Sequence, residues 1–155
     1  INEGLLARIN SSLRLLRGKE KPTVTQTFIA SDIDLPVSGS VSKLPGEPFP
    51  GGNASWAGII IDSEPNSSVR SVGAGEIVFA SDFNALSNLV ILDHGDNYLT
   101  LYGNLRSLTV TPGMLIPKGT MIGRTHGRNS NQGDGLYFEI RKNGIPIDPK
   151  IWFKY

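Results

Sequence analysis

Glycine and proline punctuate the chain at close intervals from about Phe28 onward, and this spacing restricts the fold more than any other feature of the sequence. The runs between them are short and rich in β-branched and aromatic residues. Such a pattern is typical of an all-β sandwich or barrel. No long helical pattern occurs in this part of the sequence, so we expect a mainly β domain.

A helical pattern occurs before that region, at the N-terminal end. Apolar residues three or four positions apart predict one face of an amphipathic helix. These residues are Leu5, Leu6, Ile9, Leu13 and Leu16. Gly18 ends the pattern, and the polar stretch that follows predicts a connector. We therefore divide the chain into an amphipathic helix at 1–18, a connector at 19–34 and a β domain at 35–155.

Six short runs are candidate strands of the β domain. They lie at 58–61, 69–72, 76–80, 89–92, 98–102 and 136–141. The turn at Ala74-Gly75 predicts a hairpin between the second and third runs, and the turn at residues 93–96 predicts another between the fourth and fifth. The fourth run is continuously apolar, so we expect it to be a central strand.

The last of these runs alternates apolar and polar side chains. The apolar set is Leu136, Phe138 and Ile140, and the polar set is Tyr137, Glu139 and Arg141. Successive side chains of a strand point to opposite faces. We therefore expect one buried face and one face that presents the three polar side chains, followed by a turn at Asn143-Gly144.

Charge and composition exclude several classes of function. The chain has 15 basic and 14 acidic residues and a formal net charge of +1. The two signs are interleaved, so there is no basic stripe to follow a phosphate backbone, and we expect no nucleic-acid partner. The absence of cysteine excludes disulfides, thiolate zinc sites and cysteine nucleophiles. No window approaches the roughly 18 consecutive apolar residues of a membrane helix, so we expect no transmembrane segment.

Valine, glycine and isoleucine recur every three residues between positions 110 and 122. The positions are Val110, Gly113, Ile116, Gly119 and Ile122. Lipoyl and biotinyl carrier domains share this turn pattern and carry a modified lysine at a hairpin tip. Lys118 lies in the turn region but lacks the flanking Met or Asp of those domains, so a carrier function is the weaker interpretation.

Five blocks of sequence follow one another through the β domain. They read GIII, VRSVGAGEIVFA, NLVILDHGDNYLTLYGNL, VTPGMLIPKGTMIGRTHG and GLYFEIRKNGIPIDPKIWF. In this order they resemble the LytM-type domain of the M23 zinc metallopeptidases, the cell-wall endopeptidases related to lysostaphin. The resemblance covers about residues 35 to 153. It implies an antiparallel β-sheet domain with lipoyl-like turns.

The same resemblance bears on catalysis. Active members of the family bind zinc through an H-x-x-x-D block and the second His of an H-x-H block, and use the first His of H-x-H and a Y-x-H histidine in catalysis. In this sequence those positions hold Trp56, Ile60, Gly135, Tyr137 and Asn104. A catalytic zinc needs about three protein ligands and an open position for water. The resemblance therefore implies a degenerate domain that is not an enzyme and holds no metal or other cofactor.

The two histidines of the sequence lie at other positions. His94 matches a position where the family often has a histidine outside the metal site, which implies a structural hydrogen-bonding role. His126 lies in a glycine-rich loop, and we expect it to face solvent. A metal held by both histidines with Asp93 or Asp96 is a weaker alternative, because residues of one turn lack the i,i+4 geometry of helical ligands.

Three further motifs resemble one degenerate subgroup, the EnvC-type activators of cell-wall amidases. They are WAG at 56–58, LYG at 101–103 and LYFEIR at 136–141. The resemblance implies that the vacated metal groove binds an N-acetylmuramoyl-L-alanine amidase in septal peptidoglycan hydrolysis and cell separation. The expected groove residues are Trp56, Ile60, Tyr102, Asn104, Gly135, Tyr137 and Arg141. A core position for Trp56 and Ile60, and a solvated one for Arg141, stay open as alternatives.

The subgroup also suggests a role for the N-terminal region. Residues 1–18 would cover the groove until a division-complex protein displaces them. A coiled-coil stub or a helix packed permanently on the sheet is an equal alternative. The chain begins at Ile1 rather than Met, so we expect a processed product or a fragment. The resemblance implies an exported protein of the periplasm or cell envelope. A peptidoglycan-binding or scaffold module is the alternative function, because aromatic residues suit sugars as well as proteins.

Overall fold

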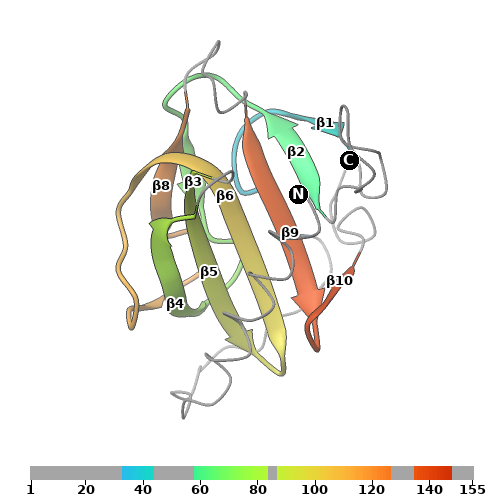
Figure 1. The fold of residues 1–155 in the computed structure, drawn as a ribbon, viewed down its shortest axis with the longest axis vertical. Coiled ribbons are helices and arrows are strands. Elements are labelled where there is room, and N and C mark those ends of the chain that lie inside the picture. Colours follow the sequence, from blue (N-terminus) through green and yellow to red (C-terminus); the bar gives the residue numbers. More distant parts are fainter. Residues whose placement is uncertain (1–32, 44–57, 84–86, 127–134, 148–155) are drawn as a thin grey trace.

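A computed structural model describes residues 33–43, 58–83, 87–126 and 135–147 (Figure 1). The predicted helix at 1–18 and the predicted groove residue Trp56 lie outside the described residues. Most of the predicted connector also lies outside them. Its last part is described, and Ile33 is 3% exposed and packs into the core.

The regular structure of the described residues consists of ten strands. They are β1 (Ser40–Lys43), β2 (Ile59–Asp62), β3 (Ser68–Arg70), β4 (Gly75–Asp82), β5 (Asn88–Gly95), β6 (Tyr98–Leu108), β7 (Leu115–Ile116), β8 (Met121–Thr125), β9 (Leu136–Lys142) and β10 (Ile145–Ile147). The mainly β prediction is confirmed. Within the described ranges, no helix has the length and apolar character needed to cross a membrane.

The strands form one antiparallel sheet whose main path runs β1-β2-β9-β6-β5-β4-β7. β10 pairs with β9, and β8 joins β3 to the far end of the long strand β6. In Figure 1, β9 lies between β2 and β6, with β5 on the other side of β6. β9 is therefore held on both sides by strands from earlier parts of the sequence, β2 and β6.

Two of the predicted turns form hairpins, although the first lies later than the predicted residues 93–96, because β5 continues to Gly95. β5 and β6 pair with each other around Asp96 and Asn97, whose φ angles are 51° and 63°. β9 and β10 pair around Asn143 and Gly144, with φ angles of 54° and 78°. Positive φ at both central residues is the geometry of the tight hairpin turns that Asn and Gly favour.

The hairpin predicted around Ala74-Gly75 is wrong. β3 pairs with β8, whereas β4 pairs with β5 and β7. The backbone after β3 forms its hydrogen bonds with other segments and not with β4. Ser71 N–H donates to the Thr120 carbonyl at 2.9 Å. The preceding Arg70 N–H donates to Pro36 O at 2.8 Å. The chain therefore passes from one part of the sheet to another instead of turning back on itself.

Both faces of the central strands are buried. The larger cluster includes Ile59, Ile61, Tyr102 and Phe138, and a second cluster includes Leu99, Leu101 and Tyr137, with Ile60 packed against it. Residues adjacent in one strand fall into different clusters, as the period of two in a strand requires. The two clusters therefore lie on opposite faces of the sheet, and the second marks the face that carries the candidate site.

Candidate functional site

Three predicted site residues share one face of the central sheet. In the strand register, Ile60 lies opposite Tyr137, Leu101 opposite Glu139 and Leu99 opposite Arg141. Paired residues of neighbouring antiparallel strands point to the same face. This surface, called here the Tyr137 face, comprises Ile60, Leu99, Leu101, Tyr137, Glu139 and Arg141. It brings Ile60, Tyr137 and Arg141 onto the same face.

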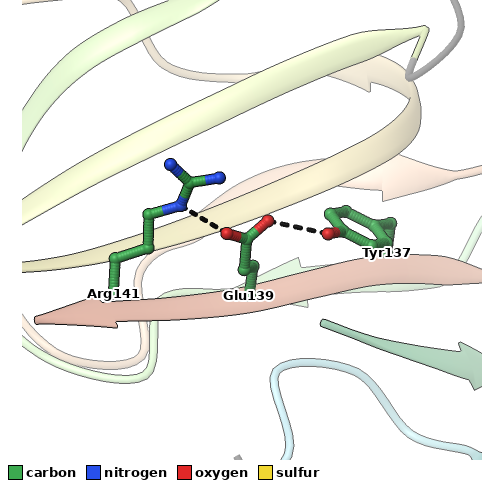
Figure 2. Close-up of polar contacts among 3 residues, drawn as sticks. All are labelled: Tyr137, Glu139 and Arg141. Atoms are coloured by element: carbon green, nitrogen blue, oxygen red, sulfur yellow. Dashed lines mark hydrogen bonds and ion pairs between the residues drawn. The ribbon is translucent and has the colours of Figure 1, made fainter. Parts of the chain in front are cut away.

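The polar side chains of β9 bond to one another along the strand, all on the same side of it (Figure 2). The Tyr137 hydroxyl donates a hydrogen bond to Glu139 Oε2 at 2.7 Å, and Arg141 Nε donates to the other carboxylate oxygen, Oε1. The Glu139 and Arg141 side chains are 0% exposed. A buried charge is tolerated when it is both paired and hydrogen-bonded. These three residues, called here the β9 ladder, meet that condition.

The burial of the ladder corrects two expectations. The polar face of this strand was predicted to present its side chains, and Arg141 had a solvated position as an alternative; both are wrong, since all three side chains are buried. The alternation itself is confirmed. The prediction failed because the polar groups satisfy one another, which lets a polar face lie inside the protein.

Tyr137 stays protonated in this environment. Burial raises the pKa of the Tyr137 phenol well above its usual value, and the charge and hydrogen bond of Glu139 add to the effect. The phenol therefore acts as a hydrogen-bond donor throughout the neutral pH range. Its role in the ladder is a polar contact with a carboxylate, and a phenolate metal ligand is disfavoured.

Asn104 and Gly135 meet beside this face. Asn104 Nδ2 donates to the Gly135 carbonyl at 2.9 Å, and Gly103 lies opposite Tyr137 in the register. Gly135 has a φ of 89°, and a Cβ placed there would lie 2.3 Å from the Ile61 carbonyl oxygen. A side chain at position 135 would therefore be strained and would require the neighbouring backbone to shift.

Tyr102 lies on the opposite face, so its predicted place beside Tyr137 is corrected. Tyr102 is 0% exposed and packs in the larger core cluster, with its ring centroid 5.2 Å from that of Phe138. The sequence suggested otherwise because its motif resembles the subgroup pattern. Since strand position 102 pairs with 138 and not with 137, the Tyr102 side chain points away from the Tyr137 face.

His94 has the structural role predicted for it. Its Nδ1 lies 2.8 Å from the Ala74 carbonyl, which can only accept, so Nδ1 carries the proton and Nε2 accepts from the Thr100 hydroxyl at 2.7 Å. Thr100 in turn lies 2.9 Å from the Tyr102 hydroxyl, to which Val72 N–H donates at 3.1 Å. Burial lowers the pKa of His94 to about 4, against smaller raising effects from the Ala74 bond and Asp93. The ring is neutral.

His126 differs from its prediction. It is half-buried rather than fully solvent-facing, and its Nε2 lies 3.0 Å from Ser87 Oγ. Burial and the neighbouring Arg106 charge lower its pKa. Among residues 33–43, 58–83, 87–126 and 135–147, no group of three or more His, Cys, Asp or Glu side chains is placed to hold a metal ion.

Sequence reasoning missed three members of the Tyr137 face. Glu139 was placed on the polar side of the strand but not among the site residues, although it joins Tyr137 to Arg141. Leu99 and Leu101 supply the neighbouring apolar surface. Their alternation with Thr100 and Tyr102 is the signal that separates the two faces of β6, and it also identifies Tyr102 as facing the other way.

A family model and several known proteins match this chain. The model described as peptidase family M23 matches residues 54–149. The murein hydrolase activator EnvC of Escherichia coli K12 is 30% identical over 118 residues, which are 76% of this chain and 28% of that protein. The lipoprotein NlpD/LppB homolog of Pseudomonas aeruginosa is 33% identical over 93 residues, 59% of this chain and 31% of that protein. The chain thus spans less than a third of the length of these relatives.

Solved structures agree on the fold. The antimicrobial peptidase lysostaphin from Staphylococcus simulans aligns with a TM-score of 0.63 and 22% identity, covering 73% of this chain and 49% of that one. Helicobacter pylori Csd3 aligns with a TM-score of 0.68 and 19% identity, covering 81% of this chain and 35% of that one. At these identities the likeness supports the shared fold alone.

Proposed function

The chain belongs to peptidase family M23, and from this premise we propose that it is a non-catalytic activator of cell-wall N-acetylmuramoyl-L-alanine amidases. It would act in septal peptidoglycan hydrolysis and cell separation, by docking the amidase on the Tyr137 face. The observation that carries the proposal is the set of residues at the family's metal and catalytic positions, whose side chains do not form a set of zinc ligands.

The chemistry of those positions argues against hydrolysis. The Ile60 side chain offers only carbon atoms, Gly135 has no side chain, and Asn104 donates its amide to a backbone carbonyl. Tyr137 stays protonated and bonds to Glu139. Trp56, at the remaining position, has no metal-binding group. A hydrolytic zinc needs about three ligands, and this set supplies no such number.

The relatives support the direction of the proposal. A protein named as a murein hydrolase activator is 30% identical over 76% of this chain, and two other relatives are named as lipoproteins. From the names of these relatives we propose that this chain is also an exported protein of the periplasm or cell envelope. Tyrosine and arginine are also among the side chains enriched at interface hot spots, and the Tyr137 face carries both.

The face must be uncovered before a partner can reach it. Tyr137 is 1% exposed, and Glu139 and Arg141 are 0% exposed, so an amidase cannot contact these side chains in the described state. We propose residues 1–18 as the restraining segment, which a recruiting protein of the division complex would draw away. Deleting residues 1–18 should then increase amidase stimulation, and unchanged stimulation would contradict the restraint.

The central experiment is a dye-release assay of amidase activity on murein, with and without the chain. The wild-type chain, or the form lacking residues 1–18, should stimulate release. Tyr137→Ala and Arg141→Glu should abolish most of the stimulation, because they remove the aromatic contact and reverse the charge. An Ile145→Ala variant, which changes an exposed side chain of the edge strand β10, is the control and should stimulate normally.

A peptidoglycan-binding or scaffold module is the second candidate function. It is favoured by a relative named as the peptidoglycan DD-endopeptidase ShyA of Vibrio cholerae, which is 28% identical over 80 residues. Aromatic side chains also pack well against sugars. Sedimentation of the chain with purified murein sacculi, in parallel with an amidase pull-down, separates the two functions. Sacculus binding without amidase binding would support the module.

A further inference from the structure

We infer that Glu139 is a positioning residue for partner docking, which holds the Arg141 guanidinium and the Tyr137 phenol in fixed orientations on the Tyr137 face. The inference rests on the proposed function, because it concerns how that face is prepared for the amidase. It assigns a role to a residue that touches two predicted contact residues and stands between them in the strand.

The bonding of Glu139 is the first observation. Its two carboxylate oxygens are used separately, Oε2 by the Tyr137 hydroxyl and Oε1 by Arg141 Nε. An ionised carboxylate only accepts hydrogen bonds, while a phenol and a guanidinium both donate. Glu139 is therefore the acceptor that both neighbours share, and each of the three side chains fixes the others (Figure 2).

The surroundings of Glu139 are the second observation. Its strand-register neighbour on the same face is Leu101, and both side chains are fully buried. Charge-assisted hydrogen bonds gain strength where water is excluded and the local dielectric constant is low. The Glu139 carboxylate consequently has strong bonds to Tyr137 and Arg141, and its neighbour Leu101 offers no competing donor.

The benefit lies in preorganisation. Arginine has a long side chain with many rotamers, and ordering it at the moment of binding opposes association. Because the bond to Glu139 already orders Arg141 through Nε, less side-chain entropy is lost when the partner binds. Arg141 then contacts the partner, while Glu139 acts through Arg141 and Tyr137 without touching the partner itself.

A double-mutant cycle tests this division of roles. Glu139→Gln keeps the shape of the side chain, but its amide can accept from only one of the two donors and turns an NH₂ group toward the other. In the wild-type background it should weaken amidase binding roughly ten- to a hundredfold, the range for one charge-assisted bond. In the Arg141→Ala background only the route through Tyr137 remains, so Glu139→Gln should weaken binding by a clearly smaller factor, because residues that act through one another are not additive.

A purely structural glutamate would behave differently. It would weaken binding by the same factor in both backgrounds, and this result would overturn the inference. Glu76→Gln, the same charge change on β4 at the far side of the sheet, is the matched control and should leave binding unchanged. Thermal unfolding of each variant shows whether it is folded, and Glu139→Asp, which is too short to reach both donors, replaces any Gln variant that is not.

A second readout does not depend on any amidase. The Arg141 Nε–H proton should give a slowly exchanging NMR signal in the free wild-type chain, and Glu139→Gln should remove it. A chain lacking residues 1–18 that shows this signal but binds no amidase would overturn the proposed function and leave the positioning of Arg141 intact. A wild-type chain that binds amidase, with the same signal and affinity in Glu139→Gln, would overturn the positioning role alone.

Discussion

Acidification should destabilise this fold through His94. The ring is neutral in the folded protein, where Nδ1–H donates to the Ala74 carbonyl and Nε2 accepts from Thr100. A second proton on Nε2 would remove that acceptor and place a charge in a site that is 2% exposed. The Thr100 and Tyr102 hydroxyls, which continue the chain of bonds to Val72 N–H, would lose their arrangement.

The size and sign of the effect follow from linkage. The pKa of His94 falls from 6.5 in the unfolded chain to about 4 in the fold, so between these values the unfolded state binds the proton and the folded state does not. The contribution of neutral His94 to the unfolding free energy is therefore fully present above pH 6.5 and is lost as the pH falls to about 4. Each unit of pKa difference is worth about 1.4 kcal/mol, which gives a loss of about 3 kcal/mol.

Urea unfolding at a series of pH values measures this loss. His94→Gln is the reference, because glutamine can still donate to Ala74 but does not titrate in this range. Carboxylates titrate in both proteins, so the difference between the two unfolding free energies isolates His94. Stability curves for wild type and His94→Gln that fall in parallel between pH 6.5 and 4 would refute the reasoning.

Further expectations concern single residues. Gly135→Ala should lower the unfolding free energy by at least roughly 1–3 kcal/mol, measured in urea, because φ is 89° and the added Cβ would lie 2.3 Å from Ile61 O. Arg141→Met should cost about 3–5 kcal/mol by leaving Glu139 buried without its cation, and the double variant with Glu139→Leu should recover most of it. Tyr102→Phe should cost about 1–3 kcal/mol by leaving Val72 N–H without its acceptor, yet leave amidase stimulation unchanged. Elemental analysis of the purified chain should find less than one zinc per ten molecules.

Much of the fold could be predicted because it depends on local chemistry. The Asn and Gly turns fix the β5–β6 and β9–β10 hairpins through positive φ, which few residues tolerate. The Ala74-Gly75 turn signal predicted the wrong pairing for the strands on either side of it, β3 and β4. Their partners, β8 for β3 and β5 and β7 for β4, are chosen by contacts that span the sequence. Local turn signals cannot report such contacts.

For the candidate site, local alternation was likewise predictable from the sequence, whereas burial and strand register were not. Alternation places Tyr137, Glu139 and Arg141 on one face of β9 correctly, since each successive side chain must change sides. Alternation cannot tell whether that face is covered, and the three residues are buried because each satisfies another. Tyr102 was misplaced because motif likeness says nothing of register, whereas its pairing with Phe138 sets its direction.

The two tyrosines show why register matters more than residue type for the function of this chain. Both Tyr102 and Tyr137 are buried, and burial raises the pKa of both phenols. Tyr102 bonds into the core network of His94, so changing it alters stability. Tyr137 bonds into the β9 ladder on the opposite face. Tyr102 is one register position away from the pair Gly103–Tyr137. That single position places Tyr102 in the core that maintains the fold and Tyr137 on the face that the proposed partner would contact.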